Sequence, residues 1–500
     1  MQAQLDMQQT ALRPRADPDV PVRLAESLSA PHGAVLGTAE VAGWLDEVRR
    51  RHAFRVDRIP FSGLDRWSFD PDTGNLVHHS GKFFTVEGLR VVTEGGPRAE
   101  WCQPIIKQPE VGILGILVKE IGGVLHCLMQ AKMEPGNPNL LQFSPTVQAT
   151  RSNYTRVHEG APVRYLDYFL QPGRGRVVTD VLQSEHGSWF HRKNNRNMIV
   201  QVDEDVEPHG DFCWLTLGQI GELLHRDNMI NMDARTVLAC APIGVVEARR
   251  APDPFLAALA RSRHGPALHS DVELLSWLTA ERARQSVRAE RVPLAGLPGW
   301  VRGTHAIGRP DGRFFQVVAL SVQAGSREVS RWTQPVIEPR GMGVNAFVTR
   351  RIDGVLHVLV AARAEAGFLG ARELGPTVQC VPGNHDDLPV EDRPGFLDLV
   401  ISADPSIIRY EAVHSEEGGR FLNAESRYLV LEPAPEQVPL DPPPGFCWVT
   451  VGQLTSLVGH SNYVNVQARS LLACLNAMQA RACVTTGSPA TVRQATSTRR

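Results

Sequence analysis

The chain has 500 residues, of which 42% are hydrophobic and 21% are charged, and its formal net charge is −2 at pH 7. A chain of this length exceeds the size at which a single hydrophobic core usually stops growing, so two domains are expected. The near-neutral, mixed charge disfavours a dedicated nucleic-acid or membrane-surface protein, because such proteins usually carry a basic patch or stripe. No apolar run approaches the roughly 18 residues of a membrane helix, and residues 1–31 lack a signal-peptide core. We therefore expect a cytoplasmic protein with no nucleic-acid or membrane partner.

The first predicted elements are a polar tail, a helix and a strand hairpin. Residues 1–35 are polar and rich in Pro and Arg, which is typical of a loose tail. An amphipathic helix is predicted over Val41–Arg51, with Trp44 on its buried face. Gly122-Gly123 lies between apolar segments and predicts a tight hairpin turn, followed by a strand from Val124.

Helices are predicted again near residue 240. One covers Thr216–His225 and the next covers Asp233–Cys240. The Pro-containing stretch that follows is interpreted as a linker over 243–270, carrying a short amphipathic helix around Leu259. The last residues, 486–500, are rich in Thr, Ser and Arg and are predicted to be a second loose tail.

The second half of the chain repeats the first. Trp101-Cys102-Gln103-Pro104 returns as Trp332-Thr333-Gln334-Pro335, a shift of 231 positions, and Phe212-Cys213-Trp214 returns as Phe446-Cys447-Trp448. This period is far longer than the roughly 20–50 residues of solenoid repeats, so it indicates a duplicated domain.

The repeat places the elements of the second half. The counterparts are a helix around Leu274–Arg284 with Trp277 on its buried face, a hairpin turn at Asp353-Gly354, and helices over Thr450–Gly459 and Gln467–Cys474. Each half is strand-rich in its middle and helical at its ends, which predicts an α+β or α/β fold with a mixed, partly antiparallel sheet flanked by helices. The predicted division is 36–242 and 271–485.

The eight cysteines form no C-x-x-C motif. Two pairs recur at equivalent positions of the repeat, Cys213 with Cys447 and Cys240 with Cys474. This pattern suits buried, reduced cysteines in the cytosol better than disulfides or zinc ligands.

A comparison of the two copies separates architecture from chemistry. Residues kept in both copies are mainly Gly, Pro, Trp and apolar, which are packing residues. A few polar residues are also shared, and for Asn228, Asn231 and Arg235 we favour a structural role at turns and caps.

The first copy keeps polar residues that the second has lost. Residues 130–137 read QAKMEPGN where the second copy reads AARAEAGF, and 191–197 read HRKNNRN where it reads LNAESRY. Neutral hydrogen-bonding groups with a few cations, and almost no acidic cluster, suit a polyhydroxylated anionic ligand. We therefore expect the site in the N-terminal half. A basic polar run such as 191–197 is often a solvated loop, and that alternative stays open.

Six stretches together resemble the NDP-hexose 2,3-dehydratases of deoxysugar biosynthesis. They are Pro60–Leu64, Gly81–Gly88, Ala131–Asn137, Ser144–Tyr154, Trp189–Asn197 and Asp227–Cys240. The resemblance spans nearly the whole chain outside the tails.

The resemblance implies a homodimer whose subunits each contain two Nudix-like modules. One module would hold the working pocket and the other would be a remnant. The implied substrate is a dTDP-4-keto-6-deoxyhexose such as dTDP-4-keto-6-deoxyglucose, and the product would pass to a separate NADPH-dependent 3-ketoreductase. A working Nudix box needs a Glu-rich helix to hold Mg²⁺, and Arg372-Glu373-Leu374 is its only echo here. We therefore predict no metal site.

The chemistry of this substrate needs no redox cofactor, and no cofactor is predicted. The C4 ketone acidifies the C3 proton, and its removal gives an enolate that expels the C2 hydroxyl. Ketonisation then leaves a 3,4-diketo-2,6-dideoxyhexose, the oxidation at C3 being balanced by reduction at C2. The protein must supply a base, an acid and donors for the O4 enolate.

Glu134 is the first candidate for base or acid, although Glu365 occupies the same place in the second copy and a structural role is the alternative. Lys132 is the candidate for stabilising the enolate and Tyr154 is the alternative proton donor. The candidates for substrate binding are Gln130, Asn137, Gln142, Ser144, Gln148, Asn153, Asn194 and Asn195. Arg192 and Arg196, with Lys193 as a weaker option, are the candidates for the pyrophosphate.

Two other functions remain open at this point. One is a Nudix-type nucleotide-sugar hydrolase, and the other is a non-catalytic nucleotide-sugar-binding module. The dehydratase hypothesis predicts that substitutions at Lys132 or Glu134 abolish product formation while a substitution at Arg363 does not.

Overall fold

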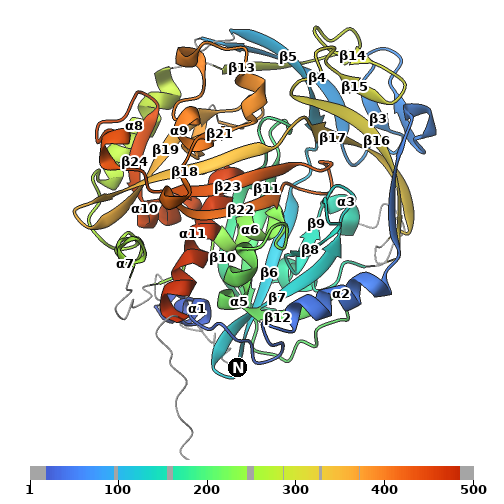
Figure 1. Ribbon diagram of the computed structural model, residues 1–500. Coiled ribbons are helices and arrows are strands. Elements are labelled where there is room, and N and C mark those ends of the chain that lie inside the picture. The colour runs from blue at the N-terminus through green and yellow to red at the C-terminus, as the bar shows by residue number, and fades with distance from the viewer. Residues whose placement is uncertain are drawn as a thin grey trace, which may run out of the picture.

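The computed structural model describes residues 18–94, 99–154, 162–244, 253–284, 287–325, 329–370 and 372–484. Within these residues the chain is a mixed α+β structure of two similar halves, as expected (Figure 1).

The helices and strands of the N-terminal half are α1 Asp19–Leu28, α2 Val41–Arg51, β1 Phe54–Ile59, β2 Trp67–Phe69, β3 Leu76–His78, β4 Thr85–Thr93, β5 Glu100–Lys107, β6 Gly112–Ile121, β7 Val124–Met133, β8 Leu141–Ser144, β9 Val147–Ala149, α3 Arg151–Tyr154, α4 Asp167–Leu170, β10 Arg176–Ser184, β11 Asn194–Gln201, β12 Phe212–Thr216, α5 Leu217–Leu224 and α6 Met232–Ala239.

The C-terminal half repeats this order. Its elements are α7 Pro254–Arg261, α8 Asp271–Arg284, β13 Val287–Val292, β14 Val301–Arg302, β15 Ala306–Gly308, β16 Phe315–Ala324, β17 Arg331–Pro339, β18 Gly343–Ile352, β19 Val355–Ala364, β20 Arg372–Gly375, β21 Val378–Cys380, α9 Leu397–Ile401, β22 Ile408–Ser415, β23 Glu425–Leu431, β24 Phe446–Thr450, α10 Val451–Val458 and α11 Val466–Val484.

Each half contains a seven-stranded mixed sheet with the same topology. In the first, the order is β10-β11-β6-β7-β12, with β8 added to β7 and β9 added to β6. In the second, the order is β22-β23-β18-β19-β20, with β24 added to β19 and β21 added to β18. One pair in each sheet is parallel, β11 with β6 and β23 with β18. The identical order confirms the duplication at the level of the fold.

The hairpin turns lie where the sequence predicts them. Gly122 and Gly123 connect β6 to β7 with φ of 61° and 81°, and Asp353 and Gly354 connect β18 to β19 with φ of 49° and 78°. Two consecutive positive φ values are required by a type I′ turn, which matches the twist of the paired strands.

The two halves exchange strands. β1 of the N-terminal half pairs antiparallel with β16, and β13 of the C-terminal half pairs antiparallel with β4. Each smaller five-stranded sheet is therefore completed by a strand from the other half. Separating the halves would break backbone hydrogen bonds in both sheets, so the two copies form one interlocked body.

The predicted starts of both copies, at residues 36 and 271, need correction. Asp19–Leu28, expected within a loose tail, form α1, because Val20, Leu24 and Leu28 are buried against the core. The short helix expected within the linker is α7, and it is the counterpart of α1. Ser27 Oγ donates to Leu125 O and Ser262 Oγ donates to Leu356 O, both at 2.5 Å. Both helices thus belong to their repeats.

The terminal helices of each half largely follow the predictions. Thr216 and Thr450 cap α5 and α10 with capping boxes, and Asn231 caps α6 through its side chain. The exception is α11, which continues to Val484 where the sequence predicted an end near Cys474. α6 packs against α11 at the centre of the molecule, between the two large sheets (Figure 1).

Two buried arginines link the halves at this centre. Arg235 donates to Ile230 O at 2.7 Å and to Ser415 O at 2.8 Å, and Arg469 donates to Val464 O and Ser184 O at 2.5 Å. Each arginine thus satisfies one backbone carbonyl of its own half and one of the other. This confirms the structural role preferred for Arg235.

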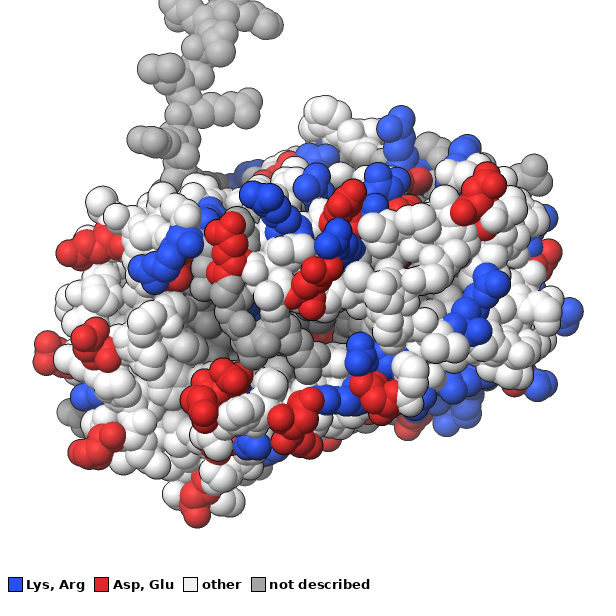
Figure 2. Space-filling model, turned by 90° about the horizontal axis from the view of Figure 1, so that it is seen from above, with Lys and Arg blue, Asp and Glu red and all other residues white. Residues whose placement is uncertain are grey.

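The cysteines and the surface agree with the composition. The seven cysteines whose side chains the structure describes are free, and Cys213, Cys240, Cys447 and Cys474 are buried. On the described part of the face drawn in Figure 2, basic and acidic side chains are interspersed. No described helix is both long and apolar enough to cross a membrane.

Candidate active site

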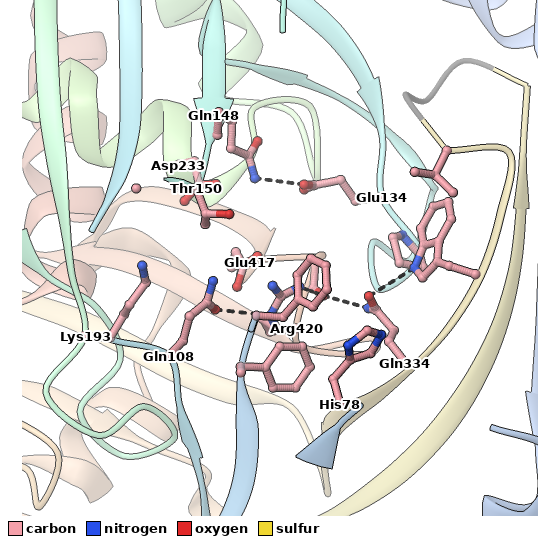
Figure 3. A pocket seen from close by; sticks show the side chains of 18 of the residues that line it. His78, Gln108, Glu134, Gln148, Thr150, Lys193, Asp233, Gln334, Glu417 and Arg420 are labelled. Atoms are coloured by element: carbon pink, nitrogen blue, oxygen red, sulfur yellow. Dashed lines mark hydrogen bonds between the residues drawn. The ribbon is translucent and has the colours of Figure 1, made fainter. Parts of the chain in front are cut away.

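A cavity of about 460 Å³ lies between the two halves. Its size is within the range of small-molecule sites. The N-terminal half contributes residues of β6, β7, β9, β11 and α6, and the C-terminal half contributes residues of β17 and of the turn 416–423 between β22 and β23 (Figure 3). The cavity is therefore lined by both halves, whereas the sequence predicted a site in the N-terminal half.

The turn 416–423 is held against the end of β7 by backbone hydrogen bonds. Gly136 N donates to Gly418 O at 2.7 Å, and Asn423 N donates to Gly136 O at 2.8 Å. A Cβ at Gly136 would collide with Phe421 O, so only glycine permits this close approach. The Pro-Gly turn after Glu134 thus brings the C-terminal half to the cavity.

Glu134 is held at the cavity wall with one oxygen unused. Its side chain follows β7, the residue is 2% exposed, and Oε1 accepts a hydrogen bond from Gln148 Nε2 at 2.9 Å. Lys132 Nζ lies 3.9 Å from the same oxygen. Oε2 is buried and has no hydrogen-bond partner among the described residues. A buried carboxylate oxygen without a partner is costly.

Three further carboxyl groups line the same end of the cavity. Burial raises the pKa of Glu185 and of Asp233, in the latter case well above its ordinary value, and Glu185 itself adds to the shift at Asp233. Burial also raises the pKa of Glu417 to about 7, against the opposing effect of Arg420. The prediction of almost no acidic cluster is therefore wrong, because these carboxyls come from segments that are far apart in the sequence.

Cationic groups lie among these carboxyls. Burial lowers the pKa of Lys193 to about 8, and its Nζ donates to the backbone oxygen of Glu110. Arg420 Nε donates to Gln108 Oε1 at 3.3 Å, and its guanidinium lies 4.3 Å from the centre of the Phe84 ring. The cavity thus has protonated and ionised groups in close proximity, which acid–base chemistry requires.

The other end of the cavity is aromatic. The His78 ring lies 5.1 Å from Trp67 and 4.8 Å from Phe83, both edge-on. Trp332 donates to Gln334 Oε1 at 3.1 Å, and Gln334 donates to Gly419 O at 2.8 Å (Figure 3). Such rings provide stacking surfaces for a planar heterocycle.

The cavity includes only some of the residues predicted from sequence. Lys132, Glu134, Gln148 and Asn195 line it, together with the weaker candidate Lys193. The predicted residues that do not line it are Gln130, Asn137, Gln142, Ser144, Arg192, Asn194 and Arg196. Asn153 and Tyr154 lie outside the residues whose side chains the structure describes.

Several of the predicted residues that do not line the cavity have other surroundings. Gln142 Nε2 donates to Ser415 Oγ at 2.8 Å across the boundary between the halves. Arg196 forms a two-point ion pair with Asp180 on the outer face of β10 and β11. Arg192 is exposed at a turn with φ of 53°.

The residues that the sequence reasoning missed include Asp233, Glu417 and Arg420. Their counterparts in the other copy are Gln467, His186 and Trp189. Glu417 and Arg420 are polar or charged residues of the second copy that the first copy lacks, which is the signal that could have found them, whereas Asp233 faces polar Gln467 and carries no such signal.

The corresponding position in the C-terminal half, which we call the mirrored site, has a different lining. It contains Arg363 and Glu365, but His186 and Trp189 occupy the place of Glu417 and Arg420 and stack with ring centres 4.9 Å apart. His186 Nε2 also lies 2.9 Å from Glu416 Oε2. Aromatic rings thus take the places of Glu417 and Arg420, although Glu365 Oε2, like Glu134 Oε2, is buried without a hydrogen-bond partner among the described residues.

Comparisons with known proteins agree with this arrangement. The family model described as NDP-hexose 2,3-dehydratase matches residues 38–241 and again residues 271–475. A relative from Amycolatopsis orientalis is 55% identical over 94% of this chain and 97% of its own length. Relatives from Saccharopolyspora spinosa (52% identical, over 91% of this chain and 94% of the relative) and Streptomyces violaceoruber (47%, over 89% and 98%) also match. All three are named dTDP-4-dehydro-6-deoxy-alpha-D-glucopyranose 2,3-dehydratase. The chain therefore belongs to the NDP-hexose 2,3-dehydratase family of carbon–oxygen lyases.

Proposed function

We propose that the protein removes water across C2 and C3 of dTDP-4-keto-6-deoxyglucose to give dTDP-3,4-diketo-2,6-dideoxyglucose. The names of the three relatives support this substrate. The observation that carries the proposal is the place of Glu134 in the lining of a cavity of nucleotide-sugar size, where Lys132 and Gln148 lie beside its carboxylate. This carboxylate is the group expected of a base that acts on a bound carbon acid.

The two ends of the cavity suggest how the substrate lies. Thymine would stack in the aromatic end, beside His78 and Trp332. The pyrophosphate would meet Arg420, with Arg66 and Arg331 at the exposed rim. We propose these arginines in place of Arg192 and Arg196, which do not line the cavity. The hexose would then reach the carboxyl-rich end.

Glu134 would remove the C3 proton, which the C4 ketone acidifies. Its carboxylate is positioned for this step, because Gln148 holds Oε1 while Oε2 has no hydrogen-bond partner among the described residues. Lys132, on the same strand, would donate to O4 as negative charge develops there. Loss of the C2 hydroxyl from this enolate, and ketonisation of the resulting enol, complete the reaction without an external oxidant.

We also propose the finer features that the family resemblance implies. These are Nudix-like ancestry of both halves, a homodimeric assembly in the cytoplasm, and a separate NADPH-dependent 3-ketoreductase that consumes the product. The mixed sheet of each half, flanked by helices, supports the ancestry. The instability expected of a 3,4-diketone supports a reductase that follows directly.

Mass spectrometry of dTDP-4-keto-6-deoxyglucose incubated with the protein tests the function. A ketoreductase and NADPH would trap the diketone. We expect loss of one water followed by reduction. Release of dTMP in the presence of Mg²⁺ would instead favour a Nudix-type hydrolase, and unchanged substrate bound to folded protein would favour a binding module.

A further inference from the structure

We propose that Glu417, supplied by the C-terminal half, is the acid that protonates the departing C2 hydroxyl. This inference rests on the proposed dehydration and adds to it a second catalytic carboxyl. It also gives the second copy of the duplicated fold a part in the chemistry.

The first observation is the position of Glu417. It belongs to the turn 416–423, which backbone hydrogen bonds attach to the Pro-Gly turn after Glu134. A Cβ built on Gly419 would collide with Glu417 Oε1 and lie 4.0 Å from Glu134 Oε1. The two carboxyls therefore face the same small volume, and in the view of Figure 3 Glu417 lies in the middle of the cavity.

The second observation is exposure to the cavity. Glu134, Glu185 and Asp233 are 2%, 4% and 2% exposed, whereas Glu417 is half-buried. Glu185 also accepts a hydrogen bond from Asn195. Glu417 is thus the most exposed carboxyl of this cluster.

The third observation is the difference between the copies. His186 stands at the position of Glu417, and in the mirrored site it is engaged by Glu416 at 2.9 Å and by Gln467 at 2.8 Å. Trp189 stands at the position of Arg420 and stacks on His186. At these positions the working cavity therefore has a carboxyl, and the mirrored site has an aromatic pair whose histidine is hydrogen-bonded.

The protonation state agrees with this role. Burial raises the pKa of Glu417 to about 7, so a large fraction carries a proton at neutral pH. An acid with a pKa near the working pH combines a sufficient protonated fraction with a strong driving force for transfer.

The proton balance closes over one turnover. Glu134 takes the C3 proton, the C3–H electrons form the enolate, and the C2–O bond breaks as Glu417 gives its proton to the leaving oxygen, which departs as water. The enol then ketonises when Glu134 returns its proton to C2 and the Glu417 carboxylate takes the proton of the C3 hydroxyl. Both carboxyls end as they began.

Glu417→Gln in D₂O separates this role from a structural one. NMR follows exchange of the C3 proton of dTDP-4-keto-6-deoxyglucose, and trapping with a ketoreductase and NADPH follows dehydration. We expect Glu417→Gln to keep C3 exchange while dehydration falls by about 10²–10⁴-fold. Glu134→Gln should lose both activities. Glu411→Gln, at an exposed carboxylate paired with Arg427, is the matched control and should keep both.

Other outcomes have distinct meanings. Equal loss of exchange and dehydration in folded Glu417→Gln would overturn the inference, as would full dehydration. If Glu417→Gln does not fold, Glu417→Asp should keep exchange and retain part of the dehydration, and loss of its exchange would contradict the proposal. Absence of dehydration by the unmodified enzyme would instead refute the proposed function itself.

Discussion

The working cavity and the mirrored site are built on equivalent strands in the same order, yet one has a glutamate and an arginine where the other has a stacked histidine and tryptophan. Both contain a glutamate held by a glutamine, Glu134 with Gln148 at 2.9 Å and Glu365 with Gln379 at 2.7 Å. They differ at the residues that arrive from the opposite half, where Glu417 and Arg420 face one site and His186 and Trp189 the other. A duplicated fold has thus become asymmetric mainly through the segments that its halves exchange.

The largest expected effect distinguishes the two glutamates. Glu134→Gln should lower kcat by about 10²–10⁴-fold, because it removes the base while keeping a hydrogen-bonding side chain of similar size. Glu365→Gln at the mirrored site should leave kcat within a few-fold, and thermal unfolding will record any cost of disturbing its contacts with Arg363 and Gln379. Comparable loss of kcat in both variants would contradict a single working site.

A smaller effect is expected at the pyrophosphate position. Arg420→Ala should raise KM by about 10–100-fold, since hydrogen bonds to charged groups contribute about 1.5–3 kcal/mol and each 1.4 kcal/mol corresponds to tenfold. The effect on kcat should be smaller, because the pyrophosphate is remote from C2 and C3. Steady-state kinetics of Arg420→Ala beside Arg427→Ala, whose arginine pairs with exposed Glu411, will measure this difference.

The pH dependence of kcat should reflect the titration of Glu417, the carboxyl that the C-terminal half supplies. A carboxyl with pKa raised to about 7 carries its proton below this pH and loses it above. If that proton is transferred in the reaction, kcat should fall by about tenfold per pH unit above 7. The charged and titratable groups that influence this carboxyl are Glu134, Glu185, Lys193, Asp233 and Arg420. A kcat that is flat from pH 6 to 9 would exclude Glu417 as the proton donor.

The contacts between the halves provide a test of stability. A Cβ at Gly136 would collide with Phe421 O and one at Gly367 with Phe190 O. Each Gly→Ala change should lower the free energy of unfolding by about 1–3 kcal/mol, as overpacking does. Gly136→Ala should in addition impair turnover strongly, because it displaces the turn that carries Glu417, while Gly367→Ala should impair it less, because the residue it displaces at the cavity is Phe190. Thermal unfolding and kcat measured on both variants will show whether the contact at Gly136 matters more for turnover than the contact at Gly367.

The smallest effect is expected at Arg196. Its guanidinium pairs with Asp180 on a partly exposed sheet surface, where ion pairs contribute only about 0–1 kcal/mol. Arg196→Ala should therefore leave KM within about twofold. A large increase in KM would restore Arg196 as a pyrophosphate ligand and would place the nucleotide elsewhere.

Much of this protein follows from its sequence alone. The duplication, the hairpin turns at Gly122-Gly123 and Asp353-Gly354 and the helix over Val41–Arg51 are local or periodic features, so they are readable from neighbouring residues. Lys132 and Glu134 could also be singled out, because they stand two residues apart at the end of one strand.

Only the tertiary structure determined how the cavity is assembled. Exchange of β1 and β13 and the backbone contact at Gly136 bring residues almost 300 positions apart to one site, and no local pattern encodes such long-range pairing. The polar residues kept only by the first copy predicted a site built by the N-terminal half. The cavity is instead lined by both halves, so Glu417 and Arg420 reach it from the copy in which the sequence predicted no site.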